Sequence, residues 1–305
     1  MKLKYRTVFI SDVHLGFNGS HAQDLAKLLK RLKCERLYLV GDIIDMWRLK
    51  QRWHWPAEHN EVVRRILKLA RKGTEVIYIP GNHDEAARQF ATLEFGGVEI
   101  RKTDIHVTAD GRKLLITHGD QFDLIIKHSR LLSMLGALAY EWLVKLNIYY
   151  NRCRAAFGFK YWSLSQFMKL KVKQACTFIS RFEQTLAHEA KKQHVDGVVC
   201  GHIHKAEQAE IDGVAYYNCG DWVESCTLLV EHRDGQMEIL DGLKLLELLH
   251  REREAEREDQ LAGVPARMSR RRRKAELLAN LEDTSWQDDD DHDEHDAPQP
   301  IALTA

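Results

Sequence analysis

The sequence has no paired cysteines and no long apolar run. Its six cysteines are scattered, and no two of them form a C-x-x-C pair. They are Cys34, Cys153, Cys176, Cys200, Cys219 and Cys226. This spacing argues against a zinc ribbon or a disulfide framework, and we expect reduced thiols. The best candidate for a membrane span is interrupted by Glu141 and Lys145, so no transmembrane helix is predicted.

The sequence also lacks a recognisable leader and a net charge. Residues 1–7 run directly into an apolar strand that Asp12 interrupts, which is unlike a signal peptide and predicts a cytoplasmic protein. The formal net charge of zero hides strong differences between segments, so it says little about partners. With 305 residues, the chain is long enough for one large domain or at most two.

The pattern that is present is a series of apolar strands that end in metal-binding residues. In the central example, the run Leu37–Val40 ends at Gly41 and is followed by Asp42. Four other segments, TVFISDVHLG, VIYIPGNHD, KLLITHGD and GVVCGHIH, repeat this plan. They supply Asp12, His14, Asn82, His83, Asp84, His118, His202 and His204.

Together these strand ends predict a metal centre. Ligands of open α/β sheets collect at the carboxyl ends of the strands, where loops vary on a rigid support. Each motif alone has an ordinary explanation, such as a helix cap or a turn, but five in one chain do not. Carboxylate, amide and imidazole donors without thiolate suit Mn²⁺, Fe, Zn²⁺ or Mg²⁺. One tetrahedral ion cannot use all seven candidate ligands, so we expect two ions about 3.5 to 4 Å apart that share Asp42. The seven are Asp12, His14, Asp42, Asn82, His118, His202 and His204.

The remaining segments predict an α/β domain over residues 1–245. Residues 21–33 form an amphipathic helix between two strands, which favours a parallel β-α-β unit. A second helix is expected over residues 57–72. Residues 103–118 read as a β-hairpin that turns at Asp110-Gly111. Short strands at 206–211, 214–218 and 227–232 indicate a second, antiparallel sheet.

The sequence does not decide the roles of Asp45 and of the aromatic loop that follows it. Asp45 follows Asp42 by three residues and is a further candidate ligand, although we favour an acceptor behind the ligands or a cap on the loop. The aromatic loop with Trp47, Trp53 and Trp55 either packs against its neighbours or lines the mouth of the site.

Residues 123–193 read as a helical insertion with a charge of roughly +8. Apolar stripes at helical spacing are usually core, but here they occur together with basic residues. We expect a hood that binds the anionic head and the apolar tails of an amphiphile. Its candidate residues are Trp162, Phe167, Lys169, Lys171 and Lys173.

Residues 246–305 are predicted to be a charged, disordered tail. This segment contains a charged helical stretch, the basic run 270–274 and the acidic run 288–291. Blocks of like charge are usually solvated, and we favour this over contact with anionic lipid or nucleic acid.

The chain resembles the calcineurin-like metallophosphoesterases. It contains their motifs in full and in order: D-x-H, G-D-x-x-D, G-N-H-[DE], H and G-H-x-H. The resemblance covers Tyr5 to Leu240. It implies an α/β fold, a two-sheet sandwich flanked by helices, with a hydroxide bridging two metals as the nucleophile. One metal would be held by Asp12, His14, Asp42 and His204. The other would be held by Asp42, Asn82, His118 and His202. His83 would donate a proton to the leaving oxygen or bind the phosphate.

Within the family, the chain is most similar to the UDP-2,3-diacylglucosamine pyrophosphatase group of lipid A synthesis. The similarity lies in the size, the segment His118–Asp123 and the helical insertion before G-H-x-H, which in that group covers the lipid. The chain departs from the group in having His83 where Arg is usual and in lacking the longer signature after Asp120.

The resemblance implies a Mn²⁺-dependent hydrolase of UDP-2,3-diacylglucosamine or a similar lipid-linked substrate. We expect it in the cytoplasm, in peripheral contact with the inner membrane face. A nucleic-acid substrate is not expected, and no partner protein is inferred. The alternatives are a phosphodiesterase, nuclease or broad-specificity phosphatase of the same family and, from another class, a metal-free scaffold.

Overall fold

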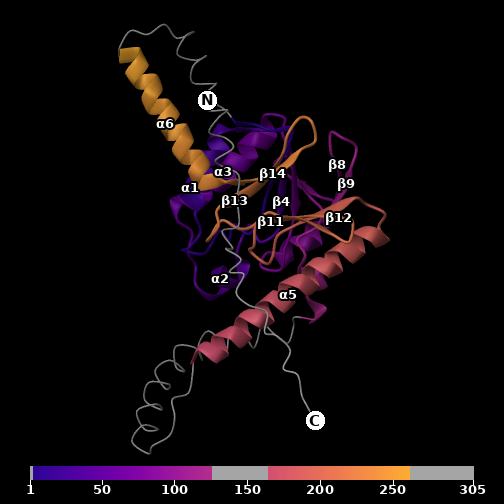
Figure 1. The fold of residues 1–305 in the computed structure, drawn as a ribbon. Coiled ribbons are helices and arrows are strands. Elements are labelled where there is room, and N and C mark those ends of the chain that lie inside the picture. The colour runs from indigo at the N-terminus through magenta and orange to yellow at the C-terminus, as the bar shows by residue number, and fades with distance from the viewer. Residues whose placement is uncertain (1–2, 126–163, 262–305) are drawn as a thin grey trace, which may run out of the picture.

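The computed structural model describes residues 3–125 and 164–261. In this part of the chain, two β-sheets pack face to face with helices on their outer faces (Figure 1). The larger sheet has the order β14 (Met237–Asp241), β13 (Thr227–Glu231), β2 (Thr7–Ile10), β4 (Arg36–Val40), β5 (Glu75–Ile79), β7 (Val98–Ile100) and β6 (Glu94–Phe95). The smaller sheet has the order β11 (Glu207–Ile211), β12 (Val214–Asn218), β10 (Gly197–Cys200), β9 (Lys113–Ile116) and β8 (Asp104–Val107).

The two faces of the larger sheet are both buried. Phe9 and Tyr38 stack with ring centroids 5.1 Å apart and face the smaller sheet, where they meet side chains such as Leu114. Val8 and Leu37, one residue earlier in each strand, belong to the core on the opposite face. Burial on both faces explains why these strands are continuous apolar runs in the sequence.

Helices cover the outer face of each sheet. Helices α1 (Ala22–Arg31) and α3 (Ala57–Arg71) share one core with the larger sheet, and α6 (Gly242–Leu261) adds Leu245 and Leu249 to it. Helix α5 (Leu164–Lys192) packs Phe182 and Leu186 against the smaller sheet. Figure 1 shows α5 and α6 on opposite sides of the body. The described residues therefore form the two-sheet sandwich flanked by helices that the sequence predicts.

The predicted β-α-β unit and hairpin are confirmed. Strands β2 and β4 are parallel across α1, with Val8 opposite Leu37, and β8 pairs antiparallel with β9. One helix boundary differs, because α1 ends at Arg31 and Leu32–Lys33 forms β3, which pairs with β1 (Leu3–Lys4). The remaining short elements are α2 (Met46–Gln51) and the 3-10 helices η1 (Glu85–Phe90) and η2 (Asp120–Ile125).

The prediction of one antiparallel second sheet after residue 206 is wrong in two respects. Strand β13 belongs to the larger sheet, where it pairs antiparallel with β2. Strand β12 pairs parallel with β10, and only its other neighbour, β11, is antiparallel. All five residues of β13 are buried, so its sequence has no alternation that would reveal which sheet it joins.

A buried polar cluster joins the two sheets at the end opposite the predicted metal ligands. The carboxylate of Glu231 in β13 lies 2.8 Å from His106 Nε2 in β8 and accepts hydrogen bonds from Thr7 Oγ1 at 2.6 Å and Ala109 N at 2.8 Å. Arg6 Nη1 adds an ion pair at 2.5 Å. Because Thr7 begins β2 and Asp12 follows its end, this cluster and the metal ligands lie at opposite ends of the strand.

Other predictions concern the insertion and the tail. Helix α6 crosses the boundary predicted at residue 245, and Leu249 beyond that boundary is buried. The domain division itself stays a prediction, because residues 126–163 and 262–305 lie outside the described residues. Among the described helices, none is both long and apolar enough to cross a membrane.

Candidate metal centre

The polar residues that follow five strands converge at one edge of the sandwich. Strands β2, β4 and β5 are mutually parallel, and β9 and β10 are parallel to each other. Their carboxyl ends therefore lead to two groups of side chains, one from each sheet. The groups meet across the gap between the sheets, as the distances below show.

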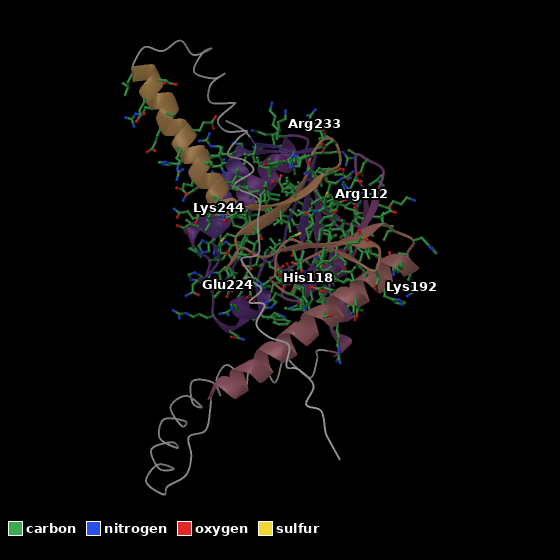
Figure 2. All side chains as sticks on the ribbon, viewed as in Figure 1. Arg112, His118, Lys192, Glu224, Arg233 and Lys244 are labelled. Atoms are coloured by element: carbon green, nitrogen blue, oxygen red, sulfur yellow. The ribbon has the colours of Figure 1, made fainter. Side chains whose placement is uncertain are left out.

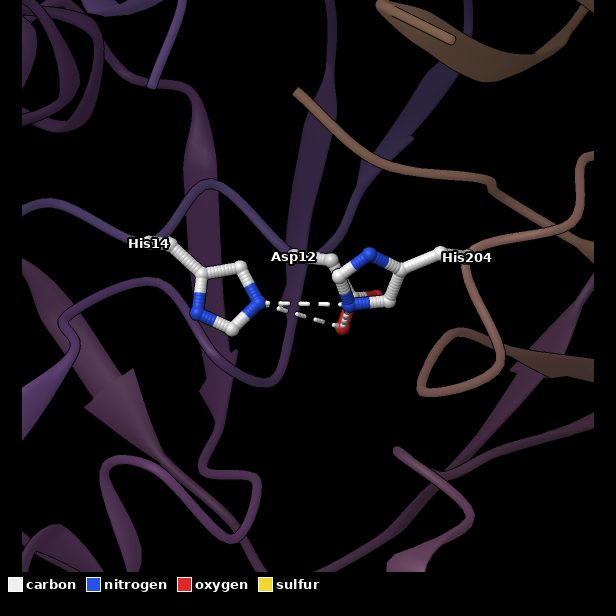
Figure 3. A group of neighbouring side chains, drawn as sticks. All are labelled: Asp12, His14 and His204. Atoms are coloured by element: carbon white, nitrogen blue, oxygen red, sulfur yellow. Dashed lines mark hydrogen bonds and ion pairs between the residues drawn. The ribbon is translucent and has the colours of Figure 1, made fainter. Parts of the chain in front are cut away.

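The first cluster consists of Asp12, His14 and His204. Their ligand atoms all lie within 4.8 Å of one another. His204 Nε2 lies 3.2 Å from Asp12 Oδ1 and 3.2 Å from His14 Nε2. Figure 3 shows the two imidazoles facing each other beside the Asp12 carboxylate. Two imidazole nitrogens and a carboxylate oxygen directed at one point form a suitable site for a divalent cation.

The second cluster consists of Asp42, His118 and His202, whose ligand atoms also lie within 4.8 Å of one another. His118 Nε2 lies 3.4 Å from Asp42 Oδ2. The other ring nitrogen, Nδ1, lies 2.9 Å from the carbonyl oxygen of Val40. A backbone contact of this kind fixes the ring of a metal-binding histidine, with Nε2 directed into the pocket. Figure 2 shows His118 in the lower part of the body and Arg233 at its upper end.

Asn82, the remaining predicted ligand, is buried at 5% exposure in the turn after β5. The turn is held against the second cluster, because the next residue, His83, donates its backbone N–H to Asp42 Oδ1 at 2.8 Å. All seven predicted ligands thus lie in loops at this edge of the sandwich. Their roles as ligands stay predictions.

The carboxylates of the pocket suit bound cations. Asp12 and Asp42 are 0% and 2% exposed. Within the described residues, Asp12 Oδ1 and His118 Nε2 are buried and make no well-aligned hydrogen bond, although His204 Nε2 and Asp42 Oδ2 lie 3.2 and 3.4 Å from them. An unsatisfied buried polar atom is costly, and a metal ion between these groups would satisfy both atoms.

The electrostatics of the pocket also favour positive charge. Burial alone would lower the pKa of His118, but the carboxylate of Asp42 raises it to about 10. In the same way, burial opposes but Asp12 raises the pKa of His204 to about 9. Although burial acts to raise the pKa of Asp42, the charges of His118 and His83 bring it below its usual value. The pocket therefore stabilises a cation, and divalent ions would take the place of the protons on these histidines.

The backbone of this edge is held in an unusual conformation. Five of the candidate ligands have positive φ: Asp12 (51°), His14 (51°), Asp42 (53°), His202 (74°) and His204 (58°). Residues other than glycine rarely adopt this left-handed conformation, and it is concentrated at functional sites. The sequence motifs give the residue types, but they do not reveal this strain.

Three glycines allow the ligand loops to approach each other. A Cβ atom on Gly41 would lie 2.1 Å from His118 Nδ1, and one on Gly81 would lie 2.3 Å from Asp42 Oδ1. A Cβ atom on Gly201 would lie 2.3 Å from Asp12 Oδ2. No side chain fits at these positions, so the glycines of the G-D, G-N and G-H motifs are needed for close packing of the ligands.

Asp45 lies between a predicted ligand and the predicted catalytic histidine. Its carboxylate is 3.4 Å from His14 Nδ1 and 3.0 Å from His83 Nδ1, and it also accepts from Arg48 N at 2.9 Å as the N-cap of α2. Burial acts to raise the pKa of Asp45, but the hydrogen bonds from His14 and His83 bring it below its usual value. The prediction that Asp45 is a cap is confirmed, whereas its role as an acceptor behind the ligands, or as a ligand itself, stays a prediction.

Two further carboxylates hold the loops. Sequence reasoning placed Asp84 among the residues at the strand ends without making it one of the seven ligands, and it did not name Asp221. Asp84 accepts from Gly81 N at 2.6 Å and Ile43 N at 2.8 Å and from the hydroxyl of Tyr78, so it joins two ligand loops. Asp221 Oδ2 lies 4.0 Å from His204 Nδ1. Asp221 follows the carboxyl end of β12, which is parallel to β10, so the strand-end rule could have identified it.

The aromatic loop fulfils both of the roles left open. The ring of Trp47 lies 4.3 Å from the ring of His83, at the site. Trp55 packs against His59, with ring centroids 5.4 Å apart, on the body of the protein. The side chain of Trp53 is 75% exposed.

The structure does not describe the side chains of the predicted hood. Phe167, Lys169, Lys171 and Lys173 lie in the first part of α5, whose side chains are not described, and Trp162 lies outside the described residues. Farther along α5, Phe182 is 3% exposed and its ring lies 5.9 Å from that of His202. Helix α5 thus packs directly beside the second cluster. The binding roles of the five hood residues stay predictions.

Comparison with known proteins agrees with this geometry. A model of the calcineurin-like phosphoesterase family matches residues 5–206. The UDP-2,3-diacylglucosamine hydrolase of Histophilus somni is 35% identical over 119 residues, which are 38% of this chain and 49% of that protein. The chain thus spans about half the length of this relative. The UDP-2,3-diacylglucosamine hydrolase of Neisseria meningitidis serogroup A is 26% identical over 231 residues, 70% of this chain and 88% of that protein.

Among solved structures, Vps29 from Entamoeba histolytica aligns with a TM-score of 0.38 and 16% identity, covering 77% of this chain and 89% of that chain.

Proposed function

We propose that the chain, which belongs to the calcineurin-like phosphoesterase family, hydrolyses the diphosphate bond of UDP-2,3-diacylglucosamine or a similar lipid-linked nucleotide. Membership of the family makes the chain a hydrolase of phosphate esters that uses divalent metal ions. The observation that carries the proposal is the convergence of two clusters of buried ligands, Asp12–His14–His204 and Asp42–His118–His202, at one edge of the sandwich.

We assign two ions to this pocket. Asp12, His14 and His204 would hold one ion, and His118, His202 and Asn82 would hold the other. Asp42 would contribute to both. When bound, the ions would polarise the phosphoryl group and lower the pKa of a bound water toward neutrality. Mn²⁺ is our choice of metal, because oxygen and imidazole donors suit it.

His83 is suited to protonate the leaving oxygen. Its Nδ1 faces Asp45 at 3.0 Å, whereas its Nε2 lies on the side of the pocket, 3.9 Å from Asp42 Oδ2. A proton on Nδ1 shared with the Asp45 carboxylate would fix the ring, and a second proton on Nε2 could then pass to the departing oxygen. The side chain of His83 is 22% exposed, so a substrate can reach it. General acid catalysis of this kind contributes about 10² to 10⁴ in rate.

The identity of the substrate is supported by the relatives and by the insertion. Both hydrolases named above act on UDP-2,3-diacylglucosamine according to their names. The basic, apolar insertion suits a substrate with acyl chains and a diphosphate, because burial of each methylene contributes about 0.8 kcal/mol. Such a substrate resides in a membrane, so we place the protein in the cytoplasm at the inner membrane face.

A substrate panel tests this proposal. The full chain with added Mn²⁺ is expected to cleave UDP-2,3-diacylglucosamine to UMP and the lipid 1-phosphate, and a chelated sample is the control. UDP-N-acetylglucosamine and a small chromogenic phosphodiester are expected to be poorer substrates. Faster cleavage of single-stranded DNA, with an affinity that falls steeply with salt, would instead support a nuclease.

The hood is tested within the same panel. Trp162→Ala with Phe167→Ala is expected to reduce hydrolysis of the lipid-tailed substrate more than hydrolysis of the chromogenic diester. Equal reductions would show that these side chains do not hold the acyl chains. The measurement is kcat/KM for each substrate.

A further inference from the structure

The segment Met46–Pro56 is a basic and aromatic surface beside the metal centre. It comprises α2 and the loop that follows, and contains three tryptophans, three basic residues and no acidic residue. The segment begins directly after Asp45, and its Trp47 ring lies 4.3 Å from the ring of His83. Figure 1 shows α2 at the lower end of the body. We name this segment the α2 surface.

Helix α2 contacts the body through its cap and two of its side chains, although none of its residues is buried. Asp45 caps its first turn by accepting from Arg48 N at 2.9 Å. The Arg48 guanidinium lies 4.0 Å from the ring centre of Phe17. Leu49 packs against Gly16, where an added Cβ atom would lie 2.7 Å from Leu49 Cγ. The direction in which α2 presents its exposed side chains is therefore fixed by the fold.

The loop after α2 is anchored by one tryptophan and exposes another. Trp55 Nε1 donates to Asn60 Oδ1 at 2.9 Å, and the Trp55 ring packs against the main core. Trp53 lies on the outer side of Trp55, with ring centroids 6.3 Å apart, and 75% of its surface is exposed. A single exposed indole is common on protein surfaces, but its amphipathic ring is suited to a membrane–water interface when basic residues lie beside it.

Two of the three basic residues of the α2 surface, Lys50 and Arg52, are outside any ion pair among the described residues. Both are exposed. Arg48 is 3.4 Å from Asp45, but its side chain is still 56% exposed. Exposed tryptophan next to lysine and arginine is the composition that binds the headgroup region of an anionic membrane, where the indole sits at the interface and the cations meet phosphate.

We propose that the α2 surface docks on a bilayer of anionic phospholipid and thereby holds the metal centre against the membrane. Trp53 would enter the interface, while Lys50 and Arg52 would meet lipid phosphates. This inference rests on the proposed lipid substrate, whose diphosphate would need to move only a short distance from the bilayer to reach His83. Nucleic acid also binds aromatic and basic surfaces, and it is included in the test as a competing ligand.

Vesicle flotation of the full chain tests the proposal. Vesicles of phosphatidylcholine with and without phosphatidylglycerol are mixed with the unaltered chain, with Lys50→Gln/Arg52→Gln and with Trp53→Ala. The matched control is Lys113→Gln/Arg233→Gln, which removes the same charge. Both control residues are exposed, and Lys113 begins β9 at the end opposite His118. Figure 2 shows Arg233 at the upper end of the body.

The unaltered chain and the control variant are expected to bind the anionic vesicles, more weakly at higher salt. Loss of both charges is expected to reduce partitioning about 25-fold, because each basic residue at an anionic surface contributes roughly fivefold. Trp53→Ala is expected to reduce it several-fold at every salt concentration. If Lys50→Gln/Arg52→Gln binds vesicles as tightly as the control, the docking proposal is wrong. It is also wrong if these two substitutions reduce binding of a single-stranded oligonucleotide but not of vesicles.

Hydrolysis of a soluble chromogenic diester separates this proposal from the proposed function. All these variants are expected to hydrolyse the diester at the rate of the unaltered chain, because none of the altered residues contacts the metal centre. Activity on the diester without vesicle binding would overturn the docking proposal alone. Vesicle binding that depends on the α2 surface, without any metal-dependent hydrolysis, would support docking and overturn the proposed function alone.

Discussion

At the scale of single residues, the predicted proton donor, His83, lies beside the two predicted metal clusters and is joined to one of them by Asp45. The predicted ligands gather in two clusters, and His83 lies outside both of them, in a third group with Asp45 and His14. Its Nδ1 is instead 3.0 Å from Asp45, which also contacts His14 at 3.4 Å. Asp45 thus contacts both the predicted proton donor, His83, and a predicted ligand, His14.

His83→Ala is expected to lower kcat by about 10² to 10⁴ because the general acid is lost, while the bound metal is unchanged. Metal content measured by atomic emission and steady-state kinetics on a small diester check this. If the variant turns over at the rate of the unaltered chain, His83 has no part in the mechanism.

Asp45→Asn, measured by kcat alone and together with His83→Ala, tests whether Asp45 acts through His83. Because Asp45 acts through His83, the two substitutions together should cost little more than His83→Ala alone. Asp45→Asn should also weaken metal binding, by about 10- to 100-fold, because it no longer orients His14. Losses in kcat that simply multiply would show that Asp45 acts independently of His83.

At the scale of strands and loops, the sequence predicted which residues converge at the edge of the sandwich better than it predicted the residues that support them. Residues such as Asp12 and His118 are recognisable because each follows an apolar run that ends at the sheet edge. The support from Asp84 depends on which backbone amides come close in space, and its spacing in the sequence does not show that. The same holds for β13, whose fully buried sequence fits either sheet.

A pair of glycines tests the close packing of the loops. Gly41 and Gly213 have nearly the same φ, 81° and 79°, but a Cβ would clash with His118 at the first position and meets nothing within 4 Å at the second. Both Gly→Ala variants should lose about 1 kcal/mol or somewhat more through backbone strain. Only Gly41→Ala should also lose metal, as measured by isothermal titration with Mn²⁺. Equal metal binding by the two variants would show that the loop has room to adapt.

The polar cluster between the sheets should make the protein sensitive to acid. Burial would raise the pKa of Glu231, but hydrogen bonds from His106 and Thr7 lower it from 4.5 to about 2. Because the folded-state pKa is depressed, the ionised carboxylate stabilises the fold above pH 4.5, and this contribution disappears as the pH falls toward 2. Its size is on the order of 3 kcal/mol.

Glu231→Gln is therefore expected to lower the free energy of unfolding at pH 7 and to flatten its decline between pH 5 and 2. Urea denaturation at a series of pH values measures both effects. Glu210→Gln, an exposed carboxylate in β11, is the control and should leave the curve unchanged. A Glu231→Gln curve parallel to that of the unaltered chain would contradict the assigned pKa.

At the scale of the whole molecule, the fold brings distant parts of the sequence to one edge. Strand ends from both sheets supply the ligands, α5 packs Phe182 beside His202, and α2 places Trp47 against His83. The sandwich and its metal edge follow from the strand motifs. The α2 surface does not, because the sequence leaves open whether its tryptophans pack or project, and only their contacts separate Trp55 from Trp53.

The central claim is that this edge holds two divalent ions, and the number of ions bound per chain tests it most directly. After equilibrium dialysis against Mn²⁺, atomic emission on the full chain should give two ions, and Asp42→Ala should give fewer because both sites use that carboxylate. A value below one for the unaltered chain, or two for Asp42→Ala, would contradict the account.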